Sequence, residues 1–264
     1  MDWPRRTLRD IRIWLGLPAS RDVGILSKMI KKLHIAAESF IGVPVPAAKA
    51  AIPDFACALY SEDIYEAFDY LQLSYRQLGP WNYWKPMYSS DGAYAASDYR
   101  ICSNYTEPDL CWKSPPHSPS DPPWEPIILI ISYTYAYLEA RETYGIYPII
   151  ASPGDYNSTL GYNSLQDAPS EEAYWEEVRQ SIRGSMSPVS HRNVTQLLIT
   201  GDAAHIPKFR EVLKEVTDSM FEEELEVLDE HPVFAGARGV AIFVMRAIWR
   251  QNHGDGSANI VQEL

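Results

Sequence analysis

The stretch from Val194 to Val216, VTQLLITGDAAHIPKFREVLKEV, constrains the fold of this chain more than any other. Residues 196–200 are a short apolar run typical of a buried strand, and apolar residues then recur at helical spacing from Ile206 onward. Between them lie four small or polar residues, Gly-Asp-Ala-Ala, that are typical of a tight turn. The stretch therefore predicts a strand, a turn and a helix, which are the repeating parts of an α/β fold.

The turn at Gly201 is also a candidate binding site. Gly201 has no side chain, and Ala203 and Ala204 have short ones, so a flat ring has room to lie against the backbone beside the helix N-terminus. Strand-to-helix turns of α/β folds carry the same small residues for packing alone. The turn by itself therefore leaves both ligand binding and packing open.

Composition limits the classes of protein to which the chain can belong. With 264 residues, 46% of them hydrophobic, it can bury the core of one large domain or of two smaller lobes. The net charge of -12 argues against nonspecific nucleic-acid binding, which needs a surface that neutralises phosphates. Residues 1–50 differ, with nine Lys or Arg against four Asp or Glu. Such a basic start is typical of a solvated helix face, and it also suits a membrane surface or an acidic partner.

The sequence favours a cytoplasmic protein. It has no run of about 18 apolar residues, so we expect no membrane span, and its start lacks the continuous apolar segment of a secretory signal. Cys57, Cys102 and Cys111 form an odd set without paired metal-ligand spacing, which favours a reducing compartment. A local bridge or half of a metal site at Cys102 and Cys111 is the less favoured alternative.

Periodicity predicts regular elements on both sides of the opening stretch. Residues 24–41 form an amphipathic helix, in which six apolar residues share one face and three lysines another, and Gly42 ends it. The six apolar residues are Ile25, Met29, Ile30, Leu33, Ala37 and Phe40. The other predicted elements are a short strand within 45–55, a helix from Ser61, a helix or strand pair at 91–102, a strand at 126–132, a helix from Ser170 to Gly184, a strand at 225–228 and a helix at 232–250.

A Pro-rich segment separates two parts of the chain. PPHSPSDPP, at 115–123, lacks periodicity and is typical of a linker or a lobe boundary. We therefore divide the chain into a first part at 1–123, a second part at 124–250 and a loose tail at 251–264.

The opening stretch resembles a motif of a known family. ITGDAAHIPKF, at 199–209, resembles the adenosine motif of the actin and seventy-kilodalton heat-shock chaperone ATPase superfamily, in which a strand, a Gly-rich turn, Ile-Pro-Lys and a helix follow in that order. Gly201 matches the first glycine of the motif, and Asp202 falls where a second glycine is usual. VFAGARGVA, at 233–241, resembles the second connecting helix of the family, with Gly236 on its glycine. The resemblance thus implies an adenosine-binding wall made of Gly201, Asp202, Ala203, Ala204, His205 and Gly236.

The resemblance covers most of residues 24–250 and implies a fold. It predicts an α/β protein with a ribonuclease-H-like core of the actin-like ATPase kind, in which an incomplete first lobe precedes a second lobe with the adenosine motif. The segments YWEEVR and AGARGVA are similar in character to divergent heat-shock-chaperone-like proteins of fungi.

Departures from the family pattern predict that catalysis is lost. Family members hold ATP between two phosphate hairpins, each with an Asp that orients metal-bound water and glycines whose amides cradle phosphate. The first hairpin has no counterpart in this chain. The second falls on residues 132–135, Ser-Tyr-Thr-Tyr, which include no carboxylate and no glycine. We therefore expect weak ATP or ADP binding at most, no Mg²⁺ site and no intact ATPase cycle.

The expected function is that of a non-catalytic interaction or regulatory protein that binds a protein partner. Three alternatives stay open. The first is an active, chaperone-like ATPase, either with compensating residues or completed by a partner chain that supplies the missing lobe. The others are an unrelated α/β enzyme that uses Asp202 and His205 as an acid/base pair, and an incomplete gene product. For Asp202 and His205, a cap and a surface histidine are the simpler interpretation.

Overall fold

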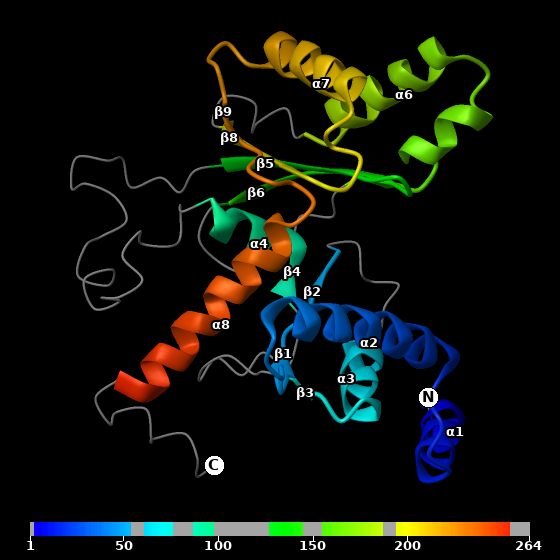
Figure 1. Ribbon diagram of the computed structural model, residues 1–264. Coiled ribbons are helices and arrows are strands. Elements are labelled where there is room, and N and C mark those ends of the chain that lie inside the picture. Colours follow the sequence, from blue (N-terminus) through cyan, green and yellow to red (C-terminus); the bar gives the residue numbers. More distant parts are fainter. Residues whose placement is uncertain are drawn as a thin grey trace. The chain divides into compact units, whose positions relative to one another are not determined.

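The computed structural model describes residues 3–53, 61–75, 87–97, 127–144, 155–186 and 194–253 (Figure 1). The chain divides into two compact units. Unit 1 comprises Met1–Ile52, Ala56–Met87 and Ala247–Leu264, and unit 2 comprises Pro53–Phe55 and Tyr88–Arg246. The Pro-rich segment that we predicted as a linker, and the cysteines at 57, 102 and 111, lie outside the described residues.

Unit 2 is built on a mixed sheet. Its described strands are β5 (Ile127–Tyr133), β6 (Leu138–Tyr144), β7 (Asp155–Asn157), β8 (Val194–Thr200) and β9 (Glu226–Leu228). They lie in the order β7-β6-β5-β8-β9, with β5 parallel to β8, β8 parallel to β9, and β6 antiparallel to both of its neighbours. The predicted α/β class and the strands predicted at 126–132, 196–200 and 225–228 are therefore confirmed.

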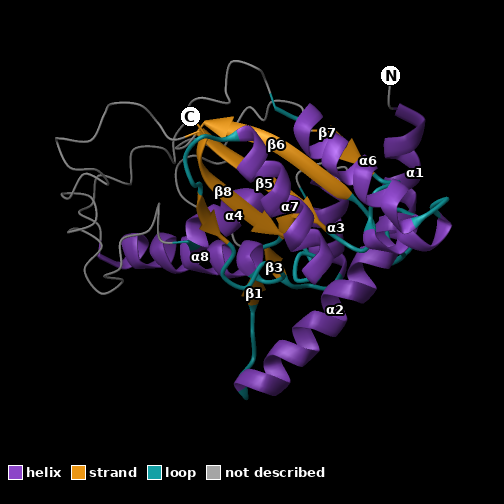
Figure 2. Cartoon of the chain, turned by 90° about the horizontal axis from the view of Figure 1, so that it is seen from above, coloured by secondary structure: helices purple, strands orange, loops and turns teal. Residues whose placement is uncertain are grey.

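Helices cover both faces of this sheet. On one face lie α6 (Glu171–Gly184) and α7 (Pro207–Met220), which pack on alternate residues of β5 (Figures 1 and 2). Against the other face lie α4 (Ser89–Ala96) and the start of α8 (Ala235–His253). Because β5 and β8 are buried on both faces, both strands are nearly continuous in apolar residues rather than alternating.

Local sequence sets where the helices of unit 2 begin. The hydroxyl of Ser170 accepts a hydrogen bond from the amide of Ala173 and so caps α6, as predicted. Pro207 stands in the first turn of α7, where its missing amide costs no helical hydrogen bond. A short 3-10 helix, η2 (Tyr162–Asp167), precedes α6. The predicted last helix is confirmed, and it continues to His253, three residues into the segment predicted as a loose tail.

Unit 1 is mainly helical in its described part. It contains α1 (Trp3–Trp14), α2 (Arg21–Ile41), α3 (Ser61–Tyr70), the two-residue strands β1 (Ala47–Ala48), β2 (Ala51–Ile52) and β3 (Ser74–Tyr75), and, at its boundary with unit 2, β4 (Met87–Tyr88). β1 and β3 pair in parallel. The predicted helix α2 is confirmed: Ser20 caps its start and Gly42, with φ 79°, ends it. Helix α1 was not among the predicted elements.

The hydrophobicity of the helices bears on membrane topology. Among the described residues, no helix is both long enough and apolar enough to cross a bilayer.

Candidate functional site

Two loops meet at one edge of the sheet in unit 2. Strand β5 ends in the hairpin turn 134–137, which leads into β6, and β8 ends in the Gly201 turn. The two strands are parallel neighbours, with Ser132 paired to Thr200, so the loops lie side by side. In open α/β sheets, ligands bind outside the carboxyl ends of parallel strands. This edge is therefore the candidate site, and the structure brings the predicted hairpin and the predicted adenosine turn together there.

Gly201 is required by the backbone around it. Its φ is +108°, and a Cβ added to it would lie 2.0 Å from the carbonyl oxygen of Tyr133. Its amide donates to the Pro232 carbonyl at 3.2 Å, and the Ala203 amide donates to the Tyr133 carbonyl at 3.2 Å. The close approach that the glycine permits is thus made to the hairpin of the protein itself, and ligand binding at Gly201 stays a prediction.

The two alanines of the turn are core residues. Ala203 and Ala204 are fully buried in the cluster beneath α6 and α7. The amide of Ala204 donates to the Gly201 carbonyl, and its own carbonyl accepts from the Arg210 guanidinium at 2.6 Å. Arg210 also forms an ion pair with Asp229 at 2.7 Å, which ties α7 to the segment after β9. Packing therefore explains the small size of both residues.

Asp202 joins the turn to the hairpin. Its side chain is exposed, and its Oδ1 accepts a hydrogen bond from the backbone amide of Tyr135 at 2.9 Å. Among the described residues, no hydrogen bond or ion pair connects Asp202 with His205, which is itself exposed. The structure thus gives Asp202 a hairpin amide as its partner and does not assemble the acid/base pair considered from the sequence.

Thr134 accepts hydrogen bonds from two further backbone amides of the hairpin turn. Its Oγ1 accepts from the amides of Ala136 at 3.1 Å and Tyr137 at 2.9 Å, and it donates to the Tyr137 carbonyl at 3.0 Å. Three consecutive amides, at 135, 136 and 137, are thus bonded by side-chain oxygens of Asp202 and Thr134. Thr and Asp are residues that form such local side-chain bonds, so the threonine could have been singled out from the sequence.

The carbonyls of the hairpin turn are also bonded within the protein. Tyr162 and Asn163, at the start of η2, donate their amides to the carbonyls of Thr134 and Tyr135, both at 3.0 Å. Gly161 lies so close to the turn that an added Cβ would stand 2.3 Å from the carbonyl carbon of Ala136. The hairpin is therefore held from two sides, by η2 and by the Gly201 turn.

Tyr133 anchors the base of the hairpin in the core. Its ring stacks on Phe209 with centroids 4.1 Å apart, and its hydroxyl lies 2.9 Å from the hydroxyl of Tyr174. The Tyr174 hydroxyl donates to the carbonyls of Leu160 and Gly161, so it accepts from Tyr133. Burial, together with this hydrogen bond, raises the pKa of Tyr133 above its ordinary value. Ser132, at the end of β5, is buried and neutral.

Gly236 lies in a contact between two helices. A Cβ added to it would stand 3.0 Å from Ser89 of α4, and one added to Gly239 would stand 1.7 Å from the Gly92 carbonyl oxygen. The three glycines let the backbones of α4 and α8 approach each other closely. This packing accounts for Gly236 without a ligand, and its place in an adenosine-binding wall stays a prediction.

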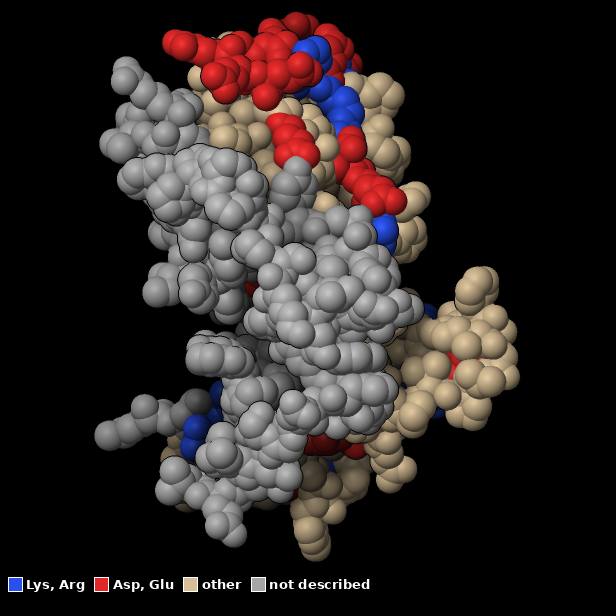
Figure 3. Space-filling model, turned by 90° about the vertical axis from the view of Figure 1, so that its left-hand side faces the viewer, with Lys and Arg blue, Asp and Glu red and all other residues tan. Residues whose placement is uncertain are grey.

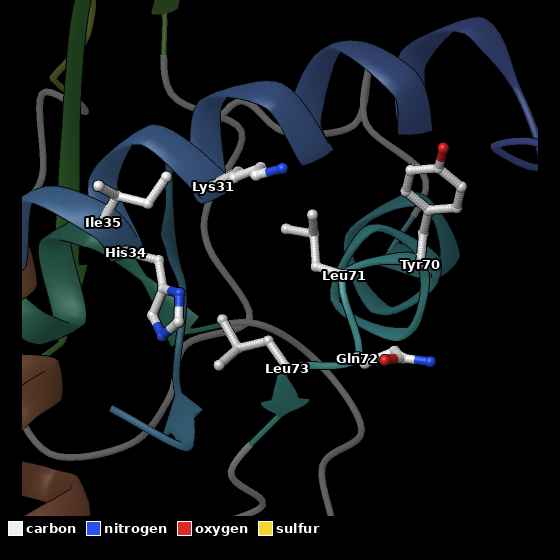
Figure 4. A pocket seen from close by; sticks show the side chains of 7 residues that line it. All are labelled: Lys31, His34, Ile35, Tyr70, Leu71, Gln72 and Leu73. Carbon is white, nitrogen blue, oxygen red and sulfur yellow. The ribbon is translucent and has the colours of Figure 1, made fainter. Parts of the chain in front are cut away.

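Unit 1 contains a separate hollow of about 420 Å³ between α2 and α3 (Figure 4). The side chains that line it are Lys31, His34, Ile35, Tyr70, Leu71, Gln72 and Leu73. The Nε2 of His34 lies 2.6 Å from the Val45 carbonyl and 3.3 Å from the Glu38 carboxylate. Since the carbonyl can only accept, His34 donates to it, as expected for a histidine with a packing role.

Charges are unevenly distributed over unit 2. Acidic side chains gather over the segment that follows α7 (Figure 3), where Glu222, Glu223 and Glu224 are exposed. Within the part of the chain that the structure describes, no group of three or more His, Cys, Asp or Glu side chains is placed to hold a metal ion.

No family model matches this chain, and no curated protein matches it. The class that the fold defines is that of mixed α/β proteins.

Proposed function

We propose that this protein is a non-catalytic member of the actin-like ATPase fold, heat-shock-chaperone-like in type, that acts as an interaction or regulatory protein. Two features support this family. The order β7-β6-β5-β8-β9, with β6 antiparallel, is similar to the sheet expected of a ribonuclease-H-like core. The candidate phosphate hairpin and the adenosine-like turn also lie at the ends of adjacent parallel strands.

The loss of catalysis is inferred from one observation, the three hairpin amides bonded to Thr134 and Asp202. In a phosphate hairpin these amides would bind phosphate oxygens. A phosphate must here displace three hydrogen bonds, each contributing about 1 kcal/mol, and approach the negative carboxylate of Asp202. The two side chains thus take the place of the anion, so we infer at most weak binding of ATP or ADP.

The residues present do not fit the metal chemistry of the family. The position of the aspartate that orients metal-bound water is taken by Ser132, which is 6% exposed and carries no charge. A neutral hydroxyl is a poor substitute for a carboxylate as a ligand of Mg²⁺. We therefore derive no hydrolytic step for this site.

Calorimetric titration with ATP and ADP, with and without Mg²⁺, tests the proposal. The wild-type protein is expected to show a Kd weaker than about 1 mM and no phosphate release. The double variant Asp202→Gly/Thr134→Gly frees the amides and should bind inorganic pyrophosphate more tightly, whereas Asp218→Ala on α7 should leave binding unchanged. Steady, Mg²⁺-dependent phosphate release by the wild type, abolished by Asp202→Ala, would contradict the proposal. Turnover that appears only with an intact family member would support the alternative of a site completed by a partner chain.

A further inference from the structure

Helix α1 turns its basic side inward. Arg9 is only 6% exposed, and its guanidinium donates to Asp63 at 2.7 Å and to Glu66. Arg5 binds Glu62, so all three acidic partners lie on α3. Burial alone would lower the pKa of Arg9, but the hydrogen bonds to Glu66 and Asp63 raise it above its ordinary value. Ion pairs therefore hold α1 against α3.

The apolar side of α1 consequently faces solvent. Counted from Trp3 at about 100° per residue, Trp14, Ile11 and Leu8 follow within an arc of about 140° on one side of α1, and Leu15 comes directly after the helix. All five side chains are exposed, and Trp14 is 83% exposed. Amphipathic helices of globular proteins usually bury this side, so α1 presents the face that a partner would be expected to cover.

Helix α2 leaves part of its apolar side uncovered as well. It packs through Val23 and Ser27, which are buried, with Leu26 and Ile30 partly buried beside the core. The stripe formed by Ile25, Met29, Leu33 and Phe40 is exposed, and Phe40 is 93% exposed. These four residues belong to the apolar face that the sequence predicts for this helix. Only part of that face is therefore buried within unit 1, and the rest is exposed to solvent.

The exposed charges of these two helices are mostly positive. Within α1 and α2, the exposed acidic residues are Asp10 and Asp22, and the exposed basic residues are Arg6, Arg21, Lys28, Lys31 and Lys32. On α2, Lys28 and Lys32 run directly beside the exposed stripe, three residues after Ile25 and Met29 respectively. An exposed apolar surface that is bordered by positive charges complements a partner that offers an apolar region directly beside negative charges.

We propose that the exposed apolar faces of α1 and α2 form a peripheral docking surface for an anionic lipid bilayer. A bilayer offers acyl chains directly beneath negative headgroups, and amphipathic helices with Trp, Phe or Leu on one face and Lys or Arg on the other lie in that boundary. The indoles of Trp3 and Trp14 suit the boundary between acyl chains and headgroups, because each has an apolar ring system and one polar N–H. A second copy of the chain fits less well, since a symmetric contact would bring the same cations together. This inference does not depend on the nucleotide site.

Vesicle flotation with the full chain tests this surface. The chain should float with phosphatidylcholine vesicles that contain about one third phosphatidylserine, and binding should weaken as salt screens the charges. Trp14→Glu on α1 and Phe40→Glu on α2 should each reduce binding at least tenfold, and Lys28→Gln and Lys32→Gln about fivefold each. The matched controls in unit 2, Phe234→Glu and Lys214→Gln, change exposed residues and should bind like the wild type.

Four outcomes would overturn the inference: no binding to the anionic vesicles, equal binding to pure phosphatidylcholine, unchanged binding of the α1 and α2 variants, or a concentration-dependent dimer that Trp14→Glu abolishes. The dimer would assign the surface to a second copy of the chain. Circular dichroism melting shows which variants are folded. Lys28→Gln and Lys32→Gln change only exposed side chains of α2 and keep the charge dependence testable if a glutamate variant unfolds.

Discussion

The carboxylate of Asp202 accepts a hydrogen bond from the backbone amide of Tyr135, with 2.9 Å between Oδ1 and N, and so ties the turn after β8 to the hairpin after β5. Asp202→Ala removes this bond and should lower the free energy of unfolding by about 1 kcal/mol. Asp202→Asn should lose less, because its amide oxygen can accept from the same donor. Urea unfolding measures both, and an Asp202→Ala variant as stable as the wild type would show that the hydrogen bond contributes nothing.

Gly201 should not tolerate any side chain. A Cβ would stand 2.0 Å from the carbonyl oxygen of Tyr133, and φ is +108°, so Gly201→Ala should lower the free energy of unfolding by about 3 kcal/mol or more. Gly184 is the control, because a Cβ there has no neighbour within 4 Å and the residue lies in α6. Gly184→Ala should stabilise the protein by about 0.5–1 kcal/mol. Thermal melting of both variants distinguishes backbone strain from a general cost of replacing glycine.

The sequence was sufficient to predict a glycine turn at 201 but not what the turn approaches. Strand, turn and helix follow from local periodicity, and those elements are confirmed. The carbonyl that excludes a side chain belongs to Tyr133, on a strand from a distant part of the sequence, and only the parallel pairing of β5 with β8 brings it there. Pairing between distant strands depends on the whole fold, so local patterns do not reveal it.

The same reasoning applies to the hairpin amides. The absence of glycine and carboxylate at 132–135 was visible in the sequence, and so was a threonine able to bond its own turn. That Asp202 completes the set could not be predicted, because its contact with Tyr135 again depends on the pairing of β5 with β8. Position 202 was interpreted as a substituted glycine of a binding wall, whereas its carboxylate is bonded to the neighbouring loop.

The close contact between α4 and α8 should not tolerate a methyl group at Gly239. A Cβ on Gly239 would lie 1.7 Å from the Gly92 carbonyl oxygen, so Gly239→Ala must push the two helices apart. The expected loss is about 2–4 kcal/mol, despite the higher helix propensity of alanine. Chemical denaturation measures it, and a variant as stable as the wild type would show that the helices do not pack at this distance.

Replacing Arg9 should lower the stability of the protein, because the carboxylate of its partner Asp63 is buried. Asp63 is 2% exposed, and Arg9→Met would leave its carboxylate without the guanidinium while keeping a side chain of similar length. The expected loss of stability is about 3–5 kcal/mol. Arg6→Met, at an exposed position one turn earlier on the same helix, should change stability by less than about 0.5 kcal/mol. Equal effects of the two substitutions would show that the ion pairs do not hold α1 against α3.

Buried tyrosines should make the protein sensitive to alkali. Burial, together with the hydrogen bond to Tyr174, raises the pKa of Tyr133 in the folded state, and burial also raises the pKa of Tyr174. Above about pH 10 the unfolded chain therefore loses phenolic protons that the folded chain still holds. The unfolded state then binds fewer protons than the native state, so stability falls as pH rises, by up to about 1.4 kcal/mol per pH unit for each such tyrosine.

Tyr133→Phe isolates the contribution of Tyr133 to this loss. The variant should be about 1 kcal/mol less stable than the wild type near neutral pH, because the bond to the Tyr174 hydroxyl is lost. Between about pH 9 and pH 11, however, its stability should fall less steeply, since one of the phenols that resist ionisation is gone. Tyr156→Phe, at a side chain that is 41% exposed, should follow the wild-type slope. Urea unfolding at each pH gives the slopes, and a Tyr133→Phe slope equal to that of the wild type would mean that the Tyr133 phenol is not protected from ionisation in the folded core.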